Sequence, residues 1–83
     1  MSNKKIPQPE KLGEKLRQIR EHLNLSQNEI LRRLGFEKQL FRSNVSQYEL
    51  GRREPPLQVL LAYARLIDTS VDVLIDDKAS LDL

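Results

Sequence analysis

The stretch from Arg42 to Gly51 holds most of the side chains in this sequence that could recognise another molecule. Val45 and Tyr48 are three residues apart, so one side of a short helix over this stretch can face a core. The other side carries hydrogen-bonding side chains of the types that contact base edges or phosphates, namely Arg42, Ser43, Asn44, Ser46 and Gln47. This combination is typical of an element that recognises nucleic acid.

Positive charge follows this stretch and runs through most of the chain. Gly51 is expected to end the helix in a left-handed conformation, and Arg52 and Arg53 come directly after it. Residues 1–67 hold 13 Lys and Arg against 7 Asp and Glu, whereas residues 68–83 hold 5 Asp against one Lys. A basic body suits a polyanion, and an acidic tail would lie away from that partner or against a second subunit. Ordinary surface charge with a solvated tail would give the same counts.

The length and composition exclude several other classes of protein. Eighty-three residues allow one small domain with a modest core. With no cysteine and a single histidine, His22, we expect no disulfide, no metal site and no cofactor. No Ser or Cys nucleophile arrangement lies near His22, so we do not expect an enzyme. No apolar run approaches the roughly 18 residues that a membrane span needs, which favours a cytoplasmic protein.

The recognition stretch follows two expected helices. The first has an apolar stripe with spacings of four, three and four, formed by Leu12, Leu16, Ile19 and Leu23. Asn24 is a plausible stop because it tolerates the left-handed conformation. Ser26 and Glu29 form a capping box, which predicts a second helix from Gln27 to Gly35. The two helices together have the outline of a helix-turn-helix.

The remaining segments complete a domain over residues 10–75. In the connector 36–41, three apolar side chains, Phe36, Leu40 and Phe41, are expected to pack, which predicts a structured loop or an extra helical turn. A fourth helix should run from about Pro56 to Ile67, and a fifth from Val71 to Ile75. The expected inward residues of the fourth are Leu57, Leu60, Leu61, Ala64 and Leu66 or Ile67, with Tyr63 at the core edge. Residues 1–9 are expected to form a mobile arm whose Lys4 and Lys5 could touch phosphates, and residues 76–83 a frayed acidic tail.

Four segments, taken in order and spacing, resemble the Cro/repressor-type helix-turn-helix proteins, also called the xenobiotic-response-element family. They are LGEKLRQIR at 12–20, LNLSQNEI at 23–30, VSQYELG at 45–51, and residues 56–75. The resemblance implies an all-α fold, a compact five-helix lambda-repressor-like domain with a lengthened turn between helices two and three. Such domains are usually dimeric, and their third helix enters the DNA major groove.

The resemblance also implies roles for particular residues. Bases would be contacted by Arg42, Ser43, Asn44 and Gln47. Phosphates would be contacted by Gln27, Ser46, Arg52 and Arg53. Arg20 and Glu49 would form a structural salt bridge between the first helix and the recognition helix.

Three features depart from the family pattern. The connector before the recognition helix is about four residues longer than usual. Phe41 stands where a capping Ser or Thr is expected, so the cap could move to Ser43 and leave Arg42 at the end of a loop. Asn24 and Asp68 replace glycines at left-handed positions, which both residue types tolerate to some degree.

The expected function is a sequence-specific regulator of transcription that binds double-stranded DNA. It would be a repressor acting as a homodimer on a palindromic operator. It could be a stand-alone repressor, a restriction-modification controller, or an antitoxin with a separately encoded protein partner. The dimer surface would use the fifth helix with Leu81 and Leu83. The alternative is a protein-interaction module that keeps the fold without specific DNA binding and docks through Phe36–Phe41.

Overall fold

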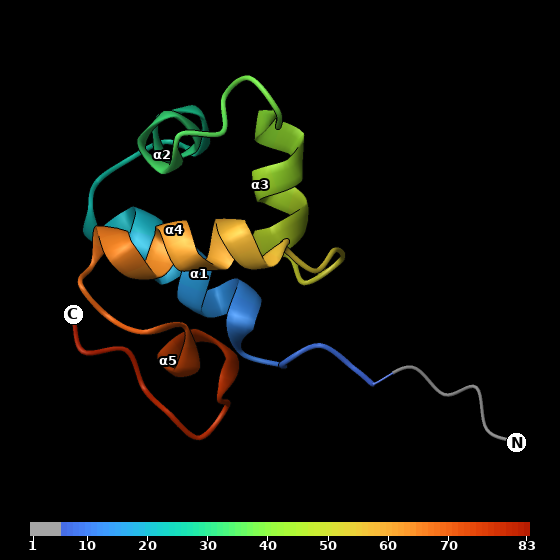
Figure 1. Cartoon of the computed structure of the whole chain (residues 1–83), viewed down its shortest axis with the longest axis vertical. Coiled ribbons are helices and arrows are strands. Elements are labelled where there is room, and N and C mark those ends of the chain that lie inside the picture. Colours follow the sequence, from blue (N-terminus) through green and yellow to red (C-terminus); the bar gives the residue numbers. More distant parts are fainter. Residues whose placement is uncertain (1–5) are drawn as a thin grey trace, which may run out of the picture.

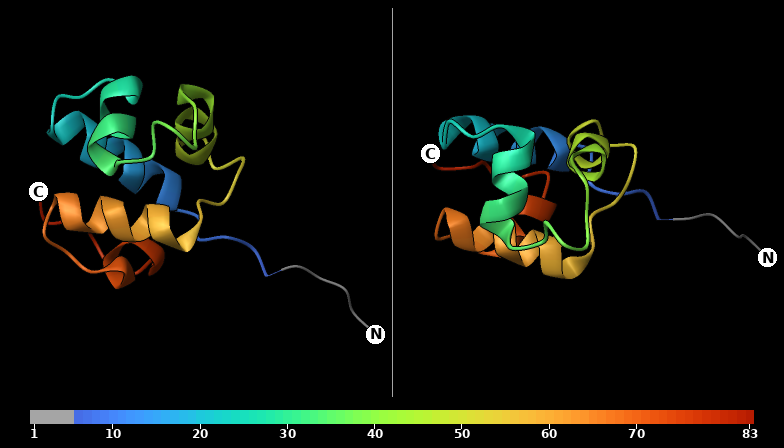
Figure 2. Two further views of the ribbon diagram at one scale, coloured as in Figure 1. Left: turned by 45° about the horizontal axis from the view of Figure 1, so that its top comes forward. Right: turned by 90° about the horizontal axis from the view of Figure 1, so that it is seen from above.

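The computed structural model describes residues 6–83, which form five helices and no strand. The helices are α1 (Leu12–His22), α2 (Gln27–Leu34), α3 (Arg42–Glu49), α4 (Leu57–Leu66) and α5 (Val71–Ile75). Figure 1 shows α4 crossing in front of α1, with α2 and α3 at one end of the molecule and α5 at the other. Both views of Figure 2 keep α2 and α3 side by side. The all-α, five-helix architecture expected from the sequence is confirmed.

Every helix contributes apolar side chains to a single core. Its buried members are Leu12, Leu16, Ile19, Ile30, Leu31, Leu34, Val45, Tyr48, Val59, Leu60, Tyr63, Ala64 and Leu74. The first three belong to the stripe predicted for the first helix, and its fourth member, Leu23, follows α1 and is only partly buried against the core. Val45 and Tyr48 are the inward face predicted for α3. The core therefore fixes which side of α3 remains open to a partner.

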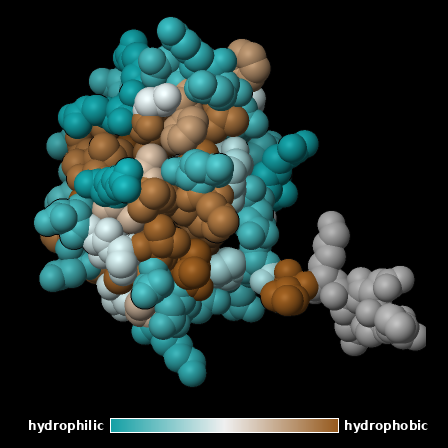
Figure 3. Space-filling view, in the orientation of Figure 1, coloured by the Kyte–Doolittle hydropathy of each residue, from teal (hydrophilic) through white to brown (hydrophobic). Residues whose placement is uncertain are grey.

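The prediction for the inward face of α4 is partly wrong. Leu57 is 78% exposed and Leu61 is 40% exposed, whereas Val59 and Tyr63 are buried. Because α4 is apolar almost all round, its sequence does not single out one stripe. The unpartnered apolar residues leave hydrophobic surface on the face where α4 lies (Figure 3). Tyr63 is fully buried rather than at the core edge.

The ends of α2 follow the local sequence. The Ser26 hydroxyl accepts a hydrogen bond from the Glu29 backbone N–H at 3.1 Å, and the Glu29 carboxylate accepts one from the Ser26 N–H at 2.9 Å. These hydrogen bonds lower the pKa of Glu29. Gly35 ends the helix with a φ of 84°. Asn24 and Asp68 adopt φ values of 56° and 53°, so both accept the left-handed conformation normally given to glycine.

The connector between α2 and α3 is a structured loop. The backbone N–H groups of Gln39 and Leu40 donate to the Phe36 carbonyl at 3.0 and 2.8 Å. Phe36 and Leu40 pack against the core, but Phe41 is 76% exposed. The expectation that all three apolar side chains pack is therefore wrong for Phe41.

The start of α3 also differs from one expectation. The helix begins at Arg42, so the cap does not move to Ser43. The Asn44 side-chain oxygen accepts a hydrogen bond from the Phe41 N–H at 2.8 Å, which satisfies a backbone group at the start of the helix. Arg42 and Ser43 consequently belong to the first turn of α3 rather than to the preceding loop.

The acidic segment after α5 does not fray at its beginning. The Asp77 carboxylate accepts hydrogen bonds from the backbone N–H groups of Glu10 and Lys11, both at 3.0 Å. Lys15, only 5% exposed, donates to the carbonyls of Val73 and Asp76 at 2.7 and 2.8 Å. These hydrogen bonds attach the segment to the start of α1.

The segment before α1 is also held in part. The Gln8 side chain donates a hydrogen bond to the Gly51 carbonyl at 2.6 Å. Gln8 is therefore not part of a mobile arm. The proposed phosphate contacts of Lys4 and Lys5 lie outside the described residues.

Candidate nucleic-acid interface

The position of α3 is set first by a close backbone contact with α1. A Cβ atom added at Gly13 would lie 2.6 Å from the Glu49 carbonyl oxygen and 2.8 Å from that of Tyr48. Only glycine therefore fits between the two helices. The contact brings the start of α1 directly against the last turn of α3.

An ion pair locks the same end of α3. Arg20 Nε lies 2.7 Å from Glu49 Oε2, and Arg20 Nη2 lies 3.0 Å from Glu49 Oε1. The side chains are 17% and 5% exposed, and the hydrogen bonds to Glu49 raise the pKa of Arg20 against the opposing effect of burial. Gln27 Nε2 also donates to Glu49 Oε1, at 3.3 Å. One carboxylate therefore holds α1, α2 and α3 in a fixed relation.

The open side of α3 forms a small hollow together with the start of α2. It has a volume of about 180 Å³. Its lining consists of Gln27, Arg42, Ser43, Ser46 and Gln47. Arg42 and Ser43 are exposed, and the other three are partly exposed. The fold thus brings five of the predicted site residues from two helices onto one surface.

Asn44 is the predicted base-contacting residue that this hollow does not include. Its side-chain oxygen already accepts the Phe41 N–H, and the residue is partly buried. A bidentate contact with adenine needs both the oxygen and the amide nitrogen of asparagine. The geometry gives Asn44 a structural part at the start of α3. Because an amide oxygen can accept a second hydrogen bond, its base contact stays a prediction.

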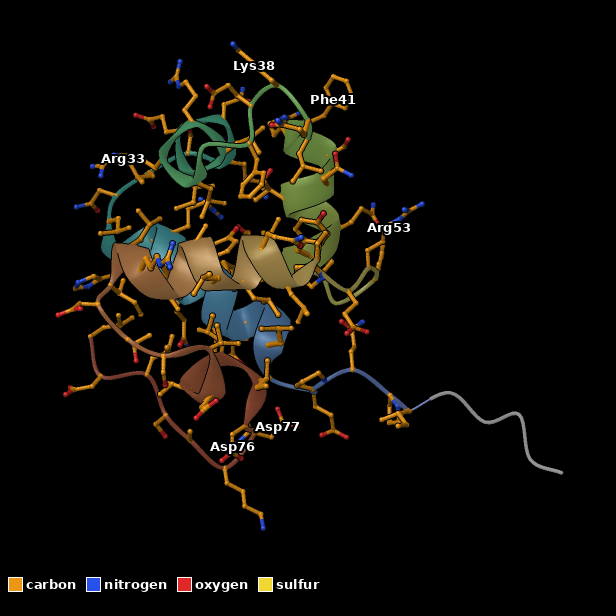
Figure 4. The ribbon with its side chains drawn as sticks, viewed as in Figure 1. Arg33, Lys38, Phe41, Arg53, Asp76 and Asp77 are labelled. Carbon is orange, nitrogen blue, oxygen red and sulfur yellow. The ribbon has the colours of Figure 1, made fainter. Side chains whose placement is uncertain are left out.

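Arg52 and Arg53 lie beyond the other end of α3. Gly51 turns the chain with a φ of 73°, and the backbone N–H groups of both arginines donate to the Gln47 carbonyl at 3.0 and 3.3 Å. Both side chains are exposed, and Figure 4 shows that of Arg53 projecting from the loop. They do not line the hollow, but they extend the positive charge beside it.

Basic side chains surround α3, with Glu29 and Glu37 nearby, and two carboxylates of the segment after α5 lie at the opposite end of the molecule. Arg42 occupies the first position of α3, whose first turn contains no acidic residue, so its charge adds to the positive end of the helix dipole. Figure 4 shows Lys38 extending from the connector at this end, with Asp76 and Asp77 at the opposite end. The surface around α3 is therefore suited to an anion.

Comparison with known families gives an assignment that agrees with this geometry. A family model described as a helix-turn-helix domain matches residues 11–76, a span that contains all five helices. The chain belongs to the helix-turn-helix domain family. The family is one of DNA-binding domains. Comparison with curated proteins gave no match.

Two other kinds of functional feature are absent from the described part of the helix-turn-helix domain. Among residues 6–83, no helix is both long enough and apolar enough to cross a membrane. The same part of the chain contains no group of three or more His, Cys, Asp or Glu side chains placed to bind a metal ion.

Two residues that shape the site are not evident from the sequence. Gly13 gives no separate signal, although a glycine directly after the first residue of an apolar stripe is consistent with a close helix contact. The sequence marks Phe41 only as an unusual cap, and its exposure beside Arg42 is visible only in the structure.

Proposed function

We propose that the protein is a transcriptional regulator of the Cro/repressor type that binds double-stranded DNA sequence-specifically. One observation carries the proposal: the polar side chains of α3 line an open hollow, while Val45 and Tyr48 hold its opposite face in the core. A helix held in this way can enter a major groove without rearrangement of the domain.

The residue types suggest a division of labour on the DNA. Arg42 suits the two acceptors of guanine, Gln47 suits adenine, and Ser43 suits either base. Phosphate contacts are proposed for Gln27, Ser46, Arg52 and Arg53. The Gln27 amide uses one N–H for Glu49 and retains a second for a phosphate. Arg42 at the start of α3 destabilises the isolated helix slightly, and a nearby phosphate would offset this effect.

We further propose that the regulator is a homodimer that represses by occupying a palindromic operator. Ile75 and Leu83 lie away from α3, are 43% and 46% exposed, and supply apolar surface for a second copy. Leu81 contributes less than the sequence suggests, because it packs against its own core. Sedimentation analysis of the wild type and of Ile75→Asp would test this surface, since a dimer formed through it should dissociate in the variant.

Selection of bound sites from a random duplex library is the main test of the proposed function. A sequence-specific regulator should enrich one site with two-fold symmetry. Gln47→Ala should then weaken operator binding by about 1–3 kcal/mol and leave binding to random DNA near its original value. Gln18→Ala, on the exposed side of α1, is the matched control. An equal loss on operator and random DNA would refute base recognition by Gln47.

The salt dependence of binding separates this function from a protein-docking module. Replacing Arg52 and Arg53 by Ala should weaken binding to all sequences, and each phosphate that is no longer neutralised should flatten the salt slope by about 1. Arg65→Ala, at the exposed end of α4, should change neither the affinity nor the slope. A wild-type protein with no measurable salt slope would favour docking through the connector instead.

A further inference from the structure

Phe41 is a large, exposed apolar side chain at the edge of the proposed DNA-binding surface. It stands directly before α3 and is 76% exposed, whereas Phe36 and Leu40 of the same connector pack against the core. In Figure 4 its ring points away from the body of the molecule at the start of α3. The exposure of Phe41 is therefore a property of its position, and not of a loop that fails to pack.

The backbone of Phe41 is fixed relative to α3. Its N–H donates to the Asn44 side chain at 2.8 Å, and its carbonyl accepts the Asn44 backbone N–H at 2.9 Å. Both backbone polar groups are thus tied to the first turn of the helix. Whatever the first turn of α3 approaches, the Phe41 side chain approaches as well.

The surroundings of Phe41 are largely polar and carry charges of both signs. The side chain borders a hollow of about 610 Å³ whose lining includes Arg32 and Arg42 together with Glu29 and Glu37. Arg42 also lines the smaller hollow on α3, so it links the two surfaces. Figure 3 shows this end of the molecule as mostly hydrophilic, with the main hydrophobic surface elsewhere, over α4. An exposed apolar group on a DNA-binding surface has one apolar partner on base edges in the major groove, the C5-methyl group of thymine.

We propose that Phe41 contacts the C5-methyl group of a thymine and makes thymine preferred at one position of each half-site. This inference rests on the proposed function, because it requires α3 to lie in the major groove. It adds a specificity-determining residue that carries no hydrogen-bonding group on its side chain.

Replacing thymine by uracil in the selected duplex tests the contact, because this change removes only the methyl group. Each thymine would be replaced singly, and the dissociation constants of the full chain measured for both duplexes. At one position per half-site, the wild type should bind the uracil duplex about fourfold more weakly, the effect of removing one buried methyl group. Phe41→Ala should bind the two duplexes equally. Leu57→Ala removes an equally exposed side chain on α4 and should keep the wild-type ratio.

The ratio between the two duplexes protects the test from an unfolding artefact. A partly unfolded variant would lose affinity for both duplexes by the same factor, so its ratio would not change. The proposal is overturned if no thymine shows a methyl effect in the wild type, or if Phe41→Ala keeps that effect. If the library yields no enriched duplex, the proposed function fails and the inference fails with it. An enriched duplex without the methyl effect overturns the inference alone.

Discussion

The two ends of α3 are held in opposite ways. At its last turn, the Glu49 side chain is 5% exposed, and it bonds to Arg20 and Gln27 while the backbone touches Gly13. At its first turn, Arg42 and Ser43 are exposed, and the capping bond from Asn44 is the side-chain hydrogen bond that holds it. The buried end therefore orients the helix, which leaves the exposed end free to carry recognition chemistry.

Glu49→Ala should have the largest effect, because it removes the side chain that holds the buried end of α3. Removing the carboxylate leaves the Arg20 guanidinium partly buried without its partner, which we expect to lower the free energy of unfolding by about 3 kcal/mol. Urea denaturation measures the change. Glu21→Ala is the control, because its pair with Arg17 spans 3.9 Å between side chains that are 53% and 60% exposed, and its loss should cost under about 0.5 kcal/mol.

The double variant Arg20→Ala, Glu49→Ala tests whether the two side chains stabilise the protein as a pair. Its destabilisation should be smaller than the sum of the two single changes, because the second substitution removes the charge that the first left unpaired. If the two losses of unfolding free energy were additive, the side chains would act independently. The backbone contact at Gly13 would then be what fixes the position of α3.

Gly13→Ala tests that backbone contact directly. The added methyl group would meet two backbone carbonyls that cannot rotate away, so we expect a loss of about 2 kcal/mol and a displaced α3. Thermal denaturation and operator binding should both record the change. Gly35→Ala offers a contrast, since its φ of 84° strains alanine by about 1 kcal/mol but no atom lies within 4 Å of the new methyl group. Equal effects of the two changes would argue against a tight contact.

Asn44→Ala addresses the exposed end of the helix. Loss of its bond to the Phe41 N–H should lower stability by about 1 kcal/mol and loosen the first turn. Operator affinity should fall along with stability, because Arg42 and Ser43 lose their fixed position. Asn28→Ala, on the exposed side of α2, should affect stability much less. If Asn44→Ala kept normal stability but lost affinity for the operator, this would support the direct base contact that the family resemblance implies for Asn44.

Local chemistry explains which parts of the fold could be predicted from the sequence. Ser26, Glu29 and Gly35 act on neighbouring backbone groups, so the ends of α2 can be predicted from residues close together in the sequence. The start of α3 does not, because its cap comes from a residue inside the helix rather than from Phe41. The inward face of α4 could not be predicted, since nearly every position in it is apolar.

Interactions between distant parts of the chain limited the prediction of the site. A resemblance to a family puts Gln27 and Gln47 on one surface, and both line the same hollow in the structure. The family pattern gives no reason to expect Asp77 at the start of α1, because its partners Glu10 and Lys11 lie more than 60 residues away in sequence. Such pairing depends on the whole fold, and local patterns do not contain it.

Asp77→Asn should have the smallest effect and one that depends on pH. Hydrogen bonds from the backbone N–H groups of Lys11 and Glu10 lower the pKa of Asp77 below its ordinary value of 3.8. A carboxylate whose pKa is lower in the folded state stabilises the protein fully above the ordinary value, and this contribution is lost as the pH falls. The melting temperatures of wild type and variant should therefore differ at pH 7 and converge below pH 3.8. Asp82→Asn, at an exposed carboxylate, is the control. Asp77 secures the start of α1 and not the first turn of α3. Operator affinity at pH 7 should therefore stay unchanged in Asp77→Asn. A loss of affinity would show that the start of α1 and the exposed end of α3 are coupled.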